Sequence, residues 1–554
     1  MDRFRIALAQ ANPLMGDIAG NLRKARAMRG DAAKAGADLI LFPELYIVGY
    51  PPEDLVLKPA LQEDAREAIE ALAKDTADGG PAVLIGAPWE DEGKLYNACL
   101  YLDEGRIAAR TYKRDLPNYG VFDEKRVFAI GPAPQPFEIR GTRIGVPVCE
   151  DIWTPDVIAC LRDKGSEILL VPNGSPFEAC KENLRLKLIR ERASESGLPL
   201  VYLNQIGGQD ELVFDGASFI CNADGSLANA LQPWEEALVL TEWSRTAKGW
   251  VCTKGPCVEE EDRISSIYHA MMLGLRDYVN KNRFPGVVLG LSGGIDSALS
   301  AAVAVDALGP DRVRCVMLPS KYTSRESLED AAEIARLLGC KYETVPIESA
   351  VETFSHALRD TFVGRAVDTT EENIQSRIRG VILMAISNKF GPMVLTTGNK
   401  SEMSVGYATL YGDMCGGFNV LKDVYKTDVF SLSRWRNENA PRNALGPNGR
   451  VMPNNVITRP PSAELRADQK DEDSLPPYEI LDGILESLVE EEMSFEQVCA
   501  KGYDGATVKR VEQLLYTSEY KRRQAPPGVK ITRRSFGRDR RYPITNAFRD
   551  ARDI

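Results

Sequence analysis

Three reactive side chains follow apolar segments that are typical of β-strands. Glu44 follows LILFP, Lys113 follows ARTY, and Cys149 follows IGVPV. Each residue alone is commonplace, since surface carboxylates, surface lysines and inert core thiols are frequent. Together they suit one chemistry, because a thiol beside a cation has a depressed pKa, a carboxylate can take its proton, and an ammonium can stabilise an oxyanion. The set therefore indicates nucleophilic catalysis by a cysteine.

A second chemical pattern follows the predicted strand VVLGL. The sequence SGGIDS, residues 292–297, leads from that strand into the predicted helix ALSAAVAVDAL. Glycines let the backbone approach a ligand closely, and the free N–H groups at the positive end of a helix attract phosphate oxygens. No GxxxxGK[ST] sequence is present, which argues against a Walker-type γ-phosphate site. We therefore expect an anion cradle of another kind.

Two carboxylates accompany this cradle, Asp296 within it and Glu402 in TTGNKSE. Carboxylate oxygens are suitable ligands for Mg²⁺, the hard cation that ATP-dependent adenylylation needs. Either carboxylate alone also has an ordinary surface explanation.

The elements that position these residues fall into two patterns, as expected for 554 residues. Up to about residue 245, short apolar strands, a hairpin at Asp103-Glu104-Gly105 and amphipathic helices predict a layered α/β sandwich. The periodicity lapses around 255–263. Beyond it, strands and helices alternate strictly, which predicts a doubly wound parallel sheet that binds ligands at the carboxyl ends of its strands. We therefore predict two α/β domains, residues 1–255 and 264–554, with a long loop at 437–477.

The composition excludes several classes of protein. A net charge of −12 argues against a general binder of nucleic acids or anionic membranes. No segment reaches the roughly 18 apolar residues of a membrane span. Eleven scattered cysteines and an opening without a signal-peptide core favour a cytoplasmic location. Only two histidines are present, so multi-histidine metal sites are almost excluded. The segment 521–541 holds nine basic residues, which substrates carrying phosphates explain more simply than RNA does.

The motifs FPEL, YKRDLP and VCEDIW resemble, in order and approximate spacing, the Glu-Lys-Cys motifs of the nitrilase (carbon–nitrogen hydrolase) superfamily. The resemblance covers residues 1 to about 245 and implies an αββα sandwich. It makes Cys149 the nucleophile, Glu44 the general base, and Lys113 the stabiliser of the tetrahedral intermediate. Glu124 matches a second carboxylate near the thiol, although a solvated charge remains an alternative.

Members of that superfamily that hydrolyse glutamine suggest a substrate pocket. The matching positions are Tyr119, Ser175 and Lys181. A hydroxyl and a cation suit an α-carboxylate. Lys181 stands where arginine is frequent, so that both a role in glutamine binding and an ordinary helix-start lysine remain open.

The cradle SGGIDS resembles the pyrophosphate loop of the ATP-pyrophosphatase family, which cleaves between the α- and β-phosphates. The strings ENIQSRIR, LTTGNKSE, YGDMCGGFNVLKDVYK and YKRRQAPPG are similar to the NAD⁺ synthetase family. By this resemblance, the residues that contact ATP are Gly290, Leu291, Ser292, Gly293, Gly294, Ile295, Asp296, Ser297 and Thr397. Those that contact deamido-NAD⁺ are Asn373, Arg377, Glu402, Asp413, Lys426 and Lys521, and the Mg²⁺ ligands are Asp296 and Glu402.

The two halves together resemble the glutamine-dependent NAD⁺ synthetase family. This implies a ligase that uses glutamine, ATP and deamido-NAD⁺ in the final step of NAD⁺ biosynthesis, with Mg²⁺ as cofactor and a homo-oligomer built on the synthetase domain. Since ammonia is mostly ammonium at neutral pH, a sheltered passage between the sites is expected.

One alternative function is that of an amidotransferase acting on another acid, such as GMP synthetase, whose glutaminase uses Cys and His. It fits poorly because no histidine precedes His269. The other rival is a non-catalytic nucleotide-binding regulator.

Overall fold

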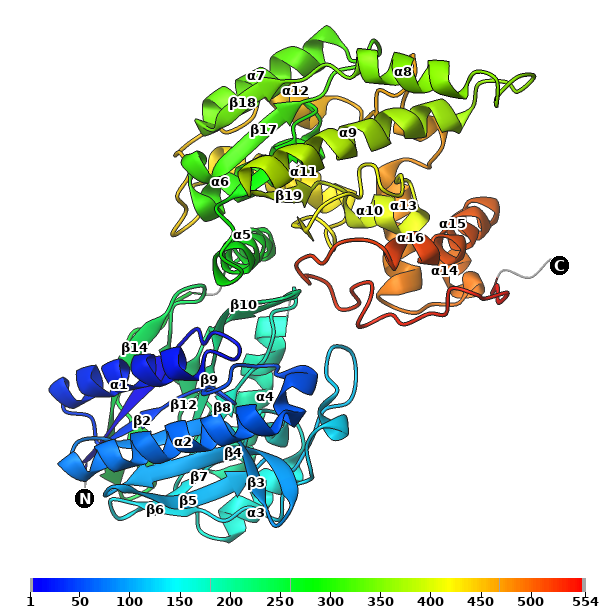
Figure 1. The fold of residues 1–554 in the computed structure, drawn as a ribbon. Helices are drawn as coiled ribbons and strands as arrows, with labels where there is room; N and C mark the ends of the chain where they lie inside the picture. The colour runs from blue at the N-terminus through cyan, green and yellow to red at the C-terminus, as the bar shows by residue number, and fades with distance from the viewer. Residues whose placement is uncertain (1–2, 180, 260, 468, 551–554) are drawn as a thin grey trace. The chain divides into compact units, whose positions relative to one another are not determined.

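The computed structural model describes residues 3–179, 181–259, 261–467 and 469–550. The chain forms two compact units, residues 1–260 and 261–554 (Figure 1). No helix in the described part of the chain is long and apolar enough to span a membrane.

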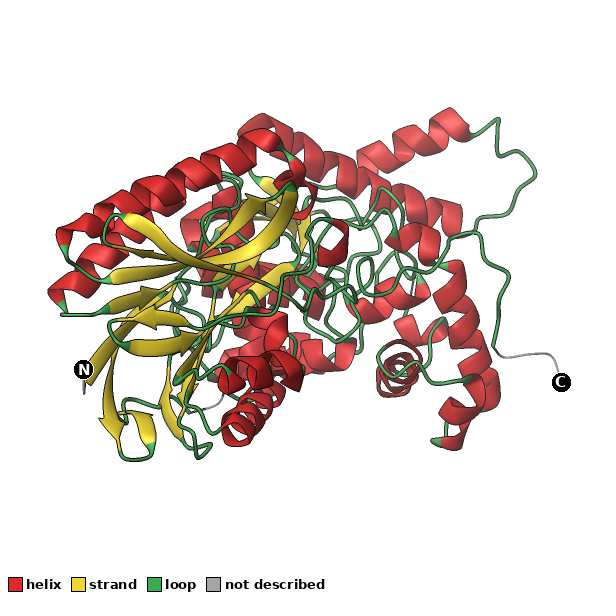
Figure 2. Cartoon of the chain, turned by 90° about the horizontal axis from the view of Figure 1, so that it is seen from below, coloured by secondary structure: helices red, strands yellow, loops and turns green. Residues whose placement is uncertain are grey.

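The first unit contains two β-sheets, visible as twisted yellow strands in Figure 2. The first sheet has the order β15-β14-β1-β2-β3-β4-β5. Its strands are β1 (Arg3–Gln10), β2 (Leu39–Leu41), β3 (Ala82–Asp91), β4 (Lys94–Asp103), β5 (Arg106–Tyr112), β14 (Ala237–Thr246) and β15 (Gly249–Cys252). The central strands β1, β2 and β3 are parallel, and the outer pairs are antiparallel.

The second sheet has the order β13-β12-β9-β8-β7-β6. Its strands are β6 (Phe137–Ile139), β7 (Thr142–Gly145), β8 (Ile168–Asn173), β9 (Leu200–Asn204), β12 (Phe219–Cys221) and β13 (Leu227–Ala230). A separate hairpin pairs β10 (Ile206–Gln209) with β11 (Leu212–Asp215).

Helices cover the outer face of each sheet. Helices α1 (Ile18–Lys34) and α2 (Pro59–Asp75) share one apolar cluster with the first sheet. Helices α3 (Pro155–Asp163) and α4 (Lys181–Ser196) share another with the second sheet. A third cluster, which includes Leu8, Leu84 and Leu170, fills the space between the sheets. This is the predicted αββα sandwich, and each side of each sheet is apolar because each side is covered.

The second unit contains a parallel sheet of order β18-β17-β16-β19-β20. The strands are β16 (Val287–Gly290), β17 (Val313–Met317), β18 (Lys341–Thr344), β19 (Met393–Thr396) and β20 (Phe418–Asn419). The reversal of strand order beside β16 is the topological switch point at which such sheets bind ligands.

One helix of this unit precedes the sheet in the chain, and the others lie between its strands or follow the last strand, β20. They are α5 (Arg263–Lys281), α6 (Ile295–Leu308), α7 (Arg325–Leu338), α8 (Glu348–Leu358), α9 (Thr369–Phe390), α10 (Lys400–Val405), α11 (Lys426–Glu438), α12 (Asn454–Thr458), α13 (Tyr478–Val489), α14 (Phe495–Ala500), α15 (Gly505–Thr517) and α16 (Glu519–Arg522). The predicted doubly wound sheet is therefore confirmed.

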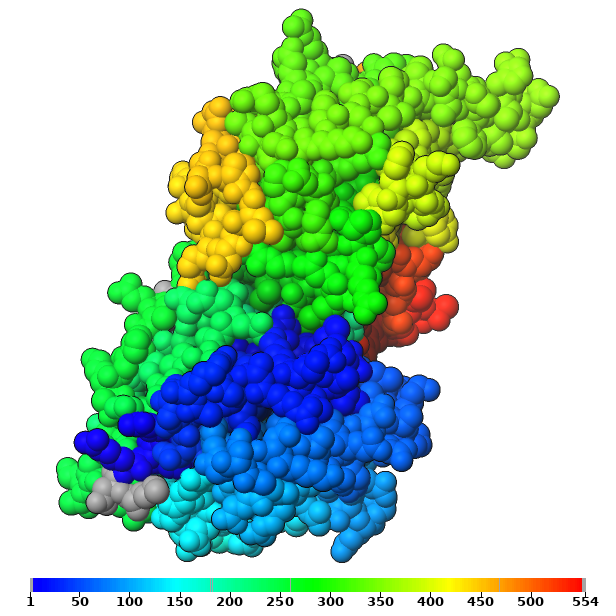
Figure 3. All heavy atoms as spheres, turned by 60° about the vertical axis from the view of Figure 1, so that its left-hand side comes forward, coloured from blue at the N-terminus to red at the C-terminus, as the bar shows by residue number. Residues whose placement is uncertain are grey.

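The predicted loop 437–477 is mostly irregular, as expected. Among its described residues, 437–467 and 469–477, the helical elements beyond the end of α11 are α12 and the 3-10 turn Asp471–Asp473. Part of it lies at the surface of the second unit, coloured orange-yellow in Figure 3.

Candidate active sites

The first unit buries a lysine between two glutamates. Lys113 Nζ donates hydrogen bonds of 2.8 Å to Glu44 Oε1 and of 2.8 Å to Glu124 Oε1. The three side chains are at most 7% exposed. Glu44 follows β2, Lys113 follows β5, and Glu124 begins a short 3-10 turn. The fold therefore brings together three of the side chains singled out in the sequence, and Glu124 is not a solvated charge.

Further polar groups fix both carboxylates. Asn97 Nδ2 donates to Glu44 Oε1 at 2.7 Å, and the Gly174 amide donates to Glu44 Oε2 at 2.9 Å. Tyr50 Oη donates to Glu124 Oε1 at 2.8 Å. A Cβ on Gly174 would lie 2.6 Å from the Tyr50 ring, so only glycine brings this amide so close. These three residues carry no sequence signal, because each lies in what reads as an ordinary strand or turn.

Burial sets the protonation of this centre. Burial raises the pKa of Glu124 to about 7, helped by the charge of Glu44 and opposed by Lys113. Burial also disfavours the Lys113 ammonium, but the two carboxylates outweigh it and raise the pKa of Lys113. Lys113 therefore stays charged at neutral pH, while Glu124 titrates there.

Cys149 begins the 3-10 turn Cys149–Ile152 with a left-handed φ of 46° and is 5% exposed. A non-glycine residue with this φ is strained, as is common for positioned nucleophiles. Asp151 fixes the turn. Its Oδ2 accepts from the Val148 amide at 2.9 Å, and its Oδ1 accepts from the Arg114 amide at 2.9 Å. One buried carboxylate therefore ties the residue before Cys149 to the residue after Lys113.

The expectation of a depressed thiol pKa at Cys149 is wrong for this structure. Burial raises the pKa of Cys149, the charge of Glu44 raises it further, and Lys113 only partly opposes them. The main reason is that burial penalises the thiolate, and the ammonium of Lys113, which is shared between two carboxylates, offsets this only in part. The resting thiol keeps its proton, which must move when a substrate is attacked.

The residues predicted for the glutamine pocket differ in burial and in their hydrogen-bond partners. Tyr119 is 55% exposed, and its Oη donates to Glu150 Oε1 at 2.9 Å. Lys181, at the start of α4, opposes the burial that raises the pKa of Glu150. Ser175 is buried, and its amide donates to Asn204 Oδ1 at 2.9 Å. The structure therefore adds Glu150 to the predicted set, next to Tyr119 and Cys149 in the chain's fold.

A buried ion pair supports the segment that carries Ser175. Arg185 Nη1 lies 2.8 Å from Asp215 Oδ1 and 2.7 Å from Asp215 Oδ2. Arg185 Nη2 donates to the carbonyls of Ser175 at 3.0 Å and Pro176 at 2.8 Å. Both side chains of the pair are at most 3% exposed. Helix α4 thus holds the backbone at Ser175 and Pro176 through one guanidinium.

We predict that Arg185→Met destabilises the first unit by about 3–5 kcal/mol, because it leaves the Asp215 carboxylate buried without its cation. Five of the six tryptophans lie in the first unit, so tryptophan fluorescence during denaturant unfolding reports mainly on it. The double variant Arg185→Met, Asp215→Leu, which removes both charges, should recover most of the loss. A single variant as stable as the parent protein would contradict this prediction.

A second prediction concerns the titration of Glu124. Glutamine hydrolysis should fall as the pH drops below about 7, since the protonated carboxyl is a weaker acceptor for Lys113 and Tyr50. In Glu124→Gln, kcat should fall by about a hundredfold, and the step near this pH should disappear. The measurement is glutamate release against pH. The exposed Glu138→Gln is the matched control, and an unchanged profile in Glu124→Gln would refute the assignment.

The second unit places the cradle SGGIDS between β16 and α6. Gly293 has a φ of 82°, and a Cβ there would lie 2.4 Å from the Ser327 carbonyl, so this turn requires glycine. Ser297 Oγ donates to the Gly294 carbonyl at 2.9 Å, and the Leu291 amide donates to the Val316 carbonyl at 2.9 Å. The turn is therefore held in shape at the start of a 14-residue helix.

Asp296 joins the cradle to α10 and α11. Its Oδ1 accepts from Asn399 Nδ2 at 2.9 Å, and its Oδ2 pairs with Lys426 Nζ. Asn399 also caps α10, because its side chain accepts from the Glu402 amide at 2.9 Å. Glu402 Oε1 lies 3.7 Å from Lys426 Nζ. Two predicted carboxylates, Asp296 and Glu402, therefore meet around the ammonium of the predicted Lys426, and Asn399, which was not predicted, connects these two residues.

A third carboxylate acts on this group. Asp471, which is 5% exposed, accepts from Tyr478 Oη at 2.9 Å, and its charge helps to raise the pKa of Lys426. Burial raises the pKa of Glu402 to about 8, with further contributions from Asp296 and Asp471 and opposition from Lys426. The single ammonium thus leaves excess negative potential among oxygen donors. Asp471 lies in the irregular segment 437–477, where periodicity gives no signal.

A cavity of about 620 Å³ opens at this end of the sheet. Of the predicted ATP contacts, the residues that line it are Gly290, Leu291, Ser292, Gly294, Ile295, Asp296, Ser297 and Thr397. Of the predicted deamido-NAD⁺ contacts, those that line it are Glu402, Asp413 and Lys426. Burial raises the pKa of Asp413 to about 6.

The other predicted dinucleotide contacts meet the chain segment 406–410, which leads to Asp413. Lys521 Nζ donates to the carbonyls of Gly406 and Ala408, each at 2.7 Å. Arg377 Nε donates to the Leu410 carbonyl at 3.2 Å, and Thr409 Oγ1 donates to Asn373 Oδ1 at 2.8 Å. These side chains therefore gather on one segment beside the cavity without lining it.

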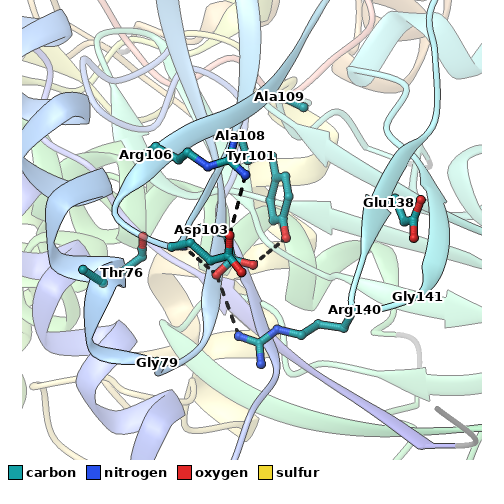
Figure 4. Close-up of a pocket in the computed structure, with 12 residues that line it drawn as sticks. Thr76, Gly79, Tyr101, Asp103, Arg106, Ala108, Ala109, Glu138, Arg140 and Gly141 are labelled. Carbon is teal, nitrogen blue, oxygen red and sulfur yellow. Dashed lines mark hydrogen bonds and ion pairs between the residues drawn. The ribbon is translucent and has the colours of Figure 1, made fainter.

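A different hollow, of about 680 Å³, lies between the hairpins β4–β5 and β6–β7 (Figure 4). Tyr101 Oη donates to Asp103 Oδ2 at 2.7 Å there, and Arg140 lies 3.8 Å from the same carboxylate. None of the predicted site residues lines this hollow.

Comparisons with known proteins agree with these two sites. The carbon-nitrogen hydrolase family matches residues 5–248, and the NAD synthase family matches residues 267–525. A glutamine-dependent NAD(+) synthetase from Rhodobacter capsulatus is 54% identical over 549 residues, which cover 99% of each chain. A protein of the same name from Thermotoga maritima is 42% identical over 582 residues, covering 99% of this chain and 100% of its own.

Solved structures show the same architecture. The glutamine-dependent NAD+ synthetase from Acinetobacter baumannii, in complex with ADP, is 43% identical with a TM-score of 0.79 and 99% coverage of each chain. The enzyme of that name from Cytophaga hutchinsonii, at 23% identity and a TM-score of 0.82 over 98% of each chain, shares the fold. Identity of this extent over the full length shows that the chain belongs to the family of glutamine-dependent NAD⁺ synthetases.

Proposed function

We propose that this chain converts deamido-NAD⁺ to NAD⁺ with ATP and with nitrogen taken from glutamine, the final step of NAD⁺ biosynthesis. The products besides NAD⁺ are AMP, pyrophosphate and glutamate. The observation that carries this assignment is the presence, in one chain, of a buried Glu-Lys-Cys centre and of a phosphate cradle ringed by carboxylates. Its relatives of the same length carry the name of this activity.

In the first unit, Cys149 Sγ attacks the side-chain carbonyl of glutamine. Glu44 takes the thiol proton and passes it to the departing ammonia, which leaves a γ-glutamyl thioester. The Lys113 ammonium stabilises the negative oxygen of the tetrahedral intermediate. Water activated by Glu44 then hydrolyses the thioester to glutamate and restores the thiol. Glu44 suits this role because three donors, from Asn97, Lys113 and Gly174, hold its carboxylate in one orientation.

In the second unit, the nicotinate carboxylate of deamido-NAD⁺ attacks the α-phosphorus of ATP and expels pyrophosphate. The cradle amides and the start of α6 hold the phosphate oxygens. Ammonia then attacks the acyl-adenylate carbonyl and expels AMP. Lys426, charged and nearly fully buried, is placed to hold phosphate or carboxylate oxygens once its contacts with Asp296 and Glu402 are shared with ligands.

The residues present fit Mg²⁺. Asp296 and Glu402 offer hard oxygen donors in a region of excess negative potential, and no group of three acidic, histidine or cysteine side chains in the described ranges forms a complete metal site. This matches the usual protein site for Mg²⁺, in which one or two carboxylates act together with substrate phosphates. When bound, the ion supplies neutralisation of the phosphate charge.

The test is an assay of the purified protein with ATP, Mg²⁺, glutamine and deamido-NAD⁺. We expect NAD⁺, AMP, pyrophosphate and glutamate in equal amounts, and omission of deamido-NAD⁺ should stop AMP formation. Nicotinate nucleotides or xanthosine monophosphate serve as alternative acids. Adenylylation of one of these in place of deamido-NAD⁺ would overturn the substrate assignment. Absence of any turnover would favour the alternative that the protein is a non-catalytic nucleotide-binding regulator.

We further propose that the protein is an obligate homo-oligomer with a dimeric synthetase core. Two segments are more apolar than the sheet of this unit requires, ISSIYHAMMLGLRDYV in α5 and SRIRGVILMAISNKF in α9, which makes both helices candidates for this contact. Helix α5 is already buried within the chain along most of its length. Helix α9 remains, because Val381 and Phe390 are 67% and 62% exposed. Val381 is the apolar side chain that this contact would cover, since Phe390, nine residues further along, lies on the opposite side of the helix with its ring centroid 4.6 Å from the Arg314 guanidinium carbon.

The expected result is a dimer or a multiple of it at micromolar concentration, with an interface above about 2,000 Å². Light scattering gives the mass directly. Val381→Glu should dissociate the core and reduce NAD⁺ synthesis more than glutamine hydrolysis, whereas Val251→Glu, at an exposed site of the first unit, should do neither. A fully active monomer would refute the proposal.

A further inference from the structure

Two free cysteines of the second unit lie in contact. Cys315 Sγ and Cys340 Sγ are 3.6 Å apart. Cys315 is the third residue of β17, and Cys340 stands between the end of α7 and the start of β18. Strands β17 and β18 are neighbours in the parallel sheet, with α7 beside them (Figure 1).

The backbone brings the two residues together. Cys315 pairs with Tyr342 in the parallel sheet, so these two side chains lie on the same face. Cys340 immediately precedes β18, and its Sγ lies beside Cys315 at that end of the strand pair. The backbone of Cys340 is fixed as well, because its amide donates to the Ala335 carbonyl at 3.2 Å.

The two thiols differ in accessibility. Cys315 is fully buried, whereas Cys340 is half-buried and so reachable from solvent. When the Cys315 thiol donates its proton to Cys340, the pKa of Cys340 is lowered and that of Cys315 is raised. The outer sulfur therefore has the greater thiolate character, which is the order that thiol–disulfide exchange requires.

We propose that Cys315 and Cys340 form a redox-active dithiol that exchanges with small-molecule disulfides and closes to a reversible intramolecular disulfide. In the first step, the Cys340 thiolate attacks one sulfur of glutathione disulfide, forms a mixed disulfide and releases one glutathione thiolate. In the second step, the Cys315 thiol loses its proton, and its sulfur attacks Cys340 Sγ and expels the second glutathione. The pair loses two electrons and two protons, and glutathione disulfide becomes two molecules of reduced glutathione.

The position of the pair connects it to the nucleotide cavity. Val316 and Met317, which directly follow Cys315, line that cavity, and so does Ser327 in the first turn of α7. The disulfide would therefore join β17, which forms one wall of the cavity, to the chain just after the C-terminal end of α7. The first turn of α7 forms another wall of the same cavity. This modification site goes beyond the proposed synthesis of NAD⁺ and does not depend on it.

The test exposes the folded full-length protein to glutathione disulfide, quenches it with iodoacetamide in denaturant so that buried free thiols are alkylated too, and maps the peptides by mass. The expected product is a peptide pair joined through Cys315 and Cys340 that has lost two hydrogens and is restored by dithiothreitol. In Cys315→Ser, the resolving thiol is absent, so a stable glutathione adduct on Cys340 is expected. Cys340→Ser should leave Cys315 unmodified because Cys315 is buried.

Two internal controls make the result decisive. Cys257 is exposed, and its modification shows that the oxidant is effective. Cys415→Ser removes a half-buried thiol of the same unit and should leave the linked peptide unchanged. The proposal is overturned if the wild-type protein carries a lasting glutathione on Cys340. It is equally overturned if both thiols remain alkylatable after Cys257 is modified.

Discussion

Cys149→Ala should abolish NAD⁺ synthesis from glutamine, by at least about a thousandfold, and leave synthesis from ammonium salts nearly unchanged. The reason is that the charges of Glu44, Lys113 and Glu124 all act on this thiol, whereas we propose that adenylylation takes place in the other unit. The measurement follows NAD⁺ and glutamate in parallel with each nitrogen source. Circular dichroism confirms that the variant is folded.

The matched control is Cys160→Ala, which removes a half-buried thiol of the same unit on α3. It should keep both activities. If Cys149→Ala lost the ammonium-dependent activity as well while remaining folded, the separation into two sites would be wrong. If it kept glutamine hydrolysis, another nucleophile would have to be sought.

Both fold classes could be predicted because they depend on local periodicity. Parallel strands covered on both sides read as continuous apolar runs, such as LILF before Glu44 and VVLGL before Ser292. Each candidate site lies where such a run ends. The chemistry that Glu44, Lys113 and Cys149 share, and the order of their motifs, indicated that they belong to one site, and the buried contact of Lys113 with Glu44 and the action of both charges on Cys149 agree with this.

The electrostatic state of the first site could not be predicted in the same way. A lysine near a cysteine suggests a depressed thiol pKa, yet the structure raises the pKa of Cys149. The outcome depends on how deeply the thiol is buried and on how many carboxylates share Lys113. Local sequence encodes neither the burial of the thiol nor the number of carboxylates around Lys113, because Glu44 and Glu124 are 80 positions apart. Asn97, which donates a hydrogen bond to Glu44, lies in yet another segment, strand β4.

Site residues that lie in irregular segments could not be predicted from the sequence either. Asp471 lies within a stretch of Asn, Pro and charged residues that has no periodicity, and only the fold brings it near Lys426 and Tyr478. Asn399, by contrast, has a signal that can be read. The spacing Asn399-x-x-Glu402 is that of a capping box, which the structure confirms for α10.

Asp296→Asn should reduce NAD⁺ formation by about a hundredfold or more with either nitrogen source, while glutamine hydrolysis continues. Asp296 is the carboxylate that links the phosphate cradle to Lys426 and Asn399, and we propose that its charge helps to hold a divalent cation against the ATP phosphates. Replacing one anionic oxygen by an amide weakens cation binding, so the Mg²⁺ concentration needed for half-maximal rate should rise. Glu402→Gln should behave in the same direction, because Glu402 faces the same ammonium.

The control for both variants is Asp311→Asn, an exposed carboxylate of the same unit that should change neither the rate nor the Mg²⁺ requirement. Retained glutaminase activity shows that each variant is folded in the first unit, and an unchanged unfolding profile shows the same for the second. A uniform loss of rate at every Mg²⁺ concentration would place Asp296 in substrate positioning and outside the metal site. Near-normal turnover at limiting Mg²⁺ would remove it from both roles, because no charge in the cradle would then depend on this carboxylate.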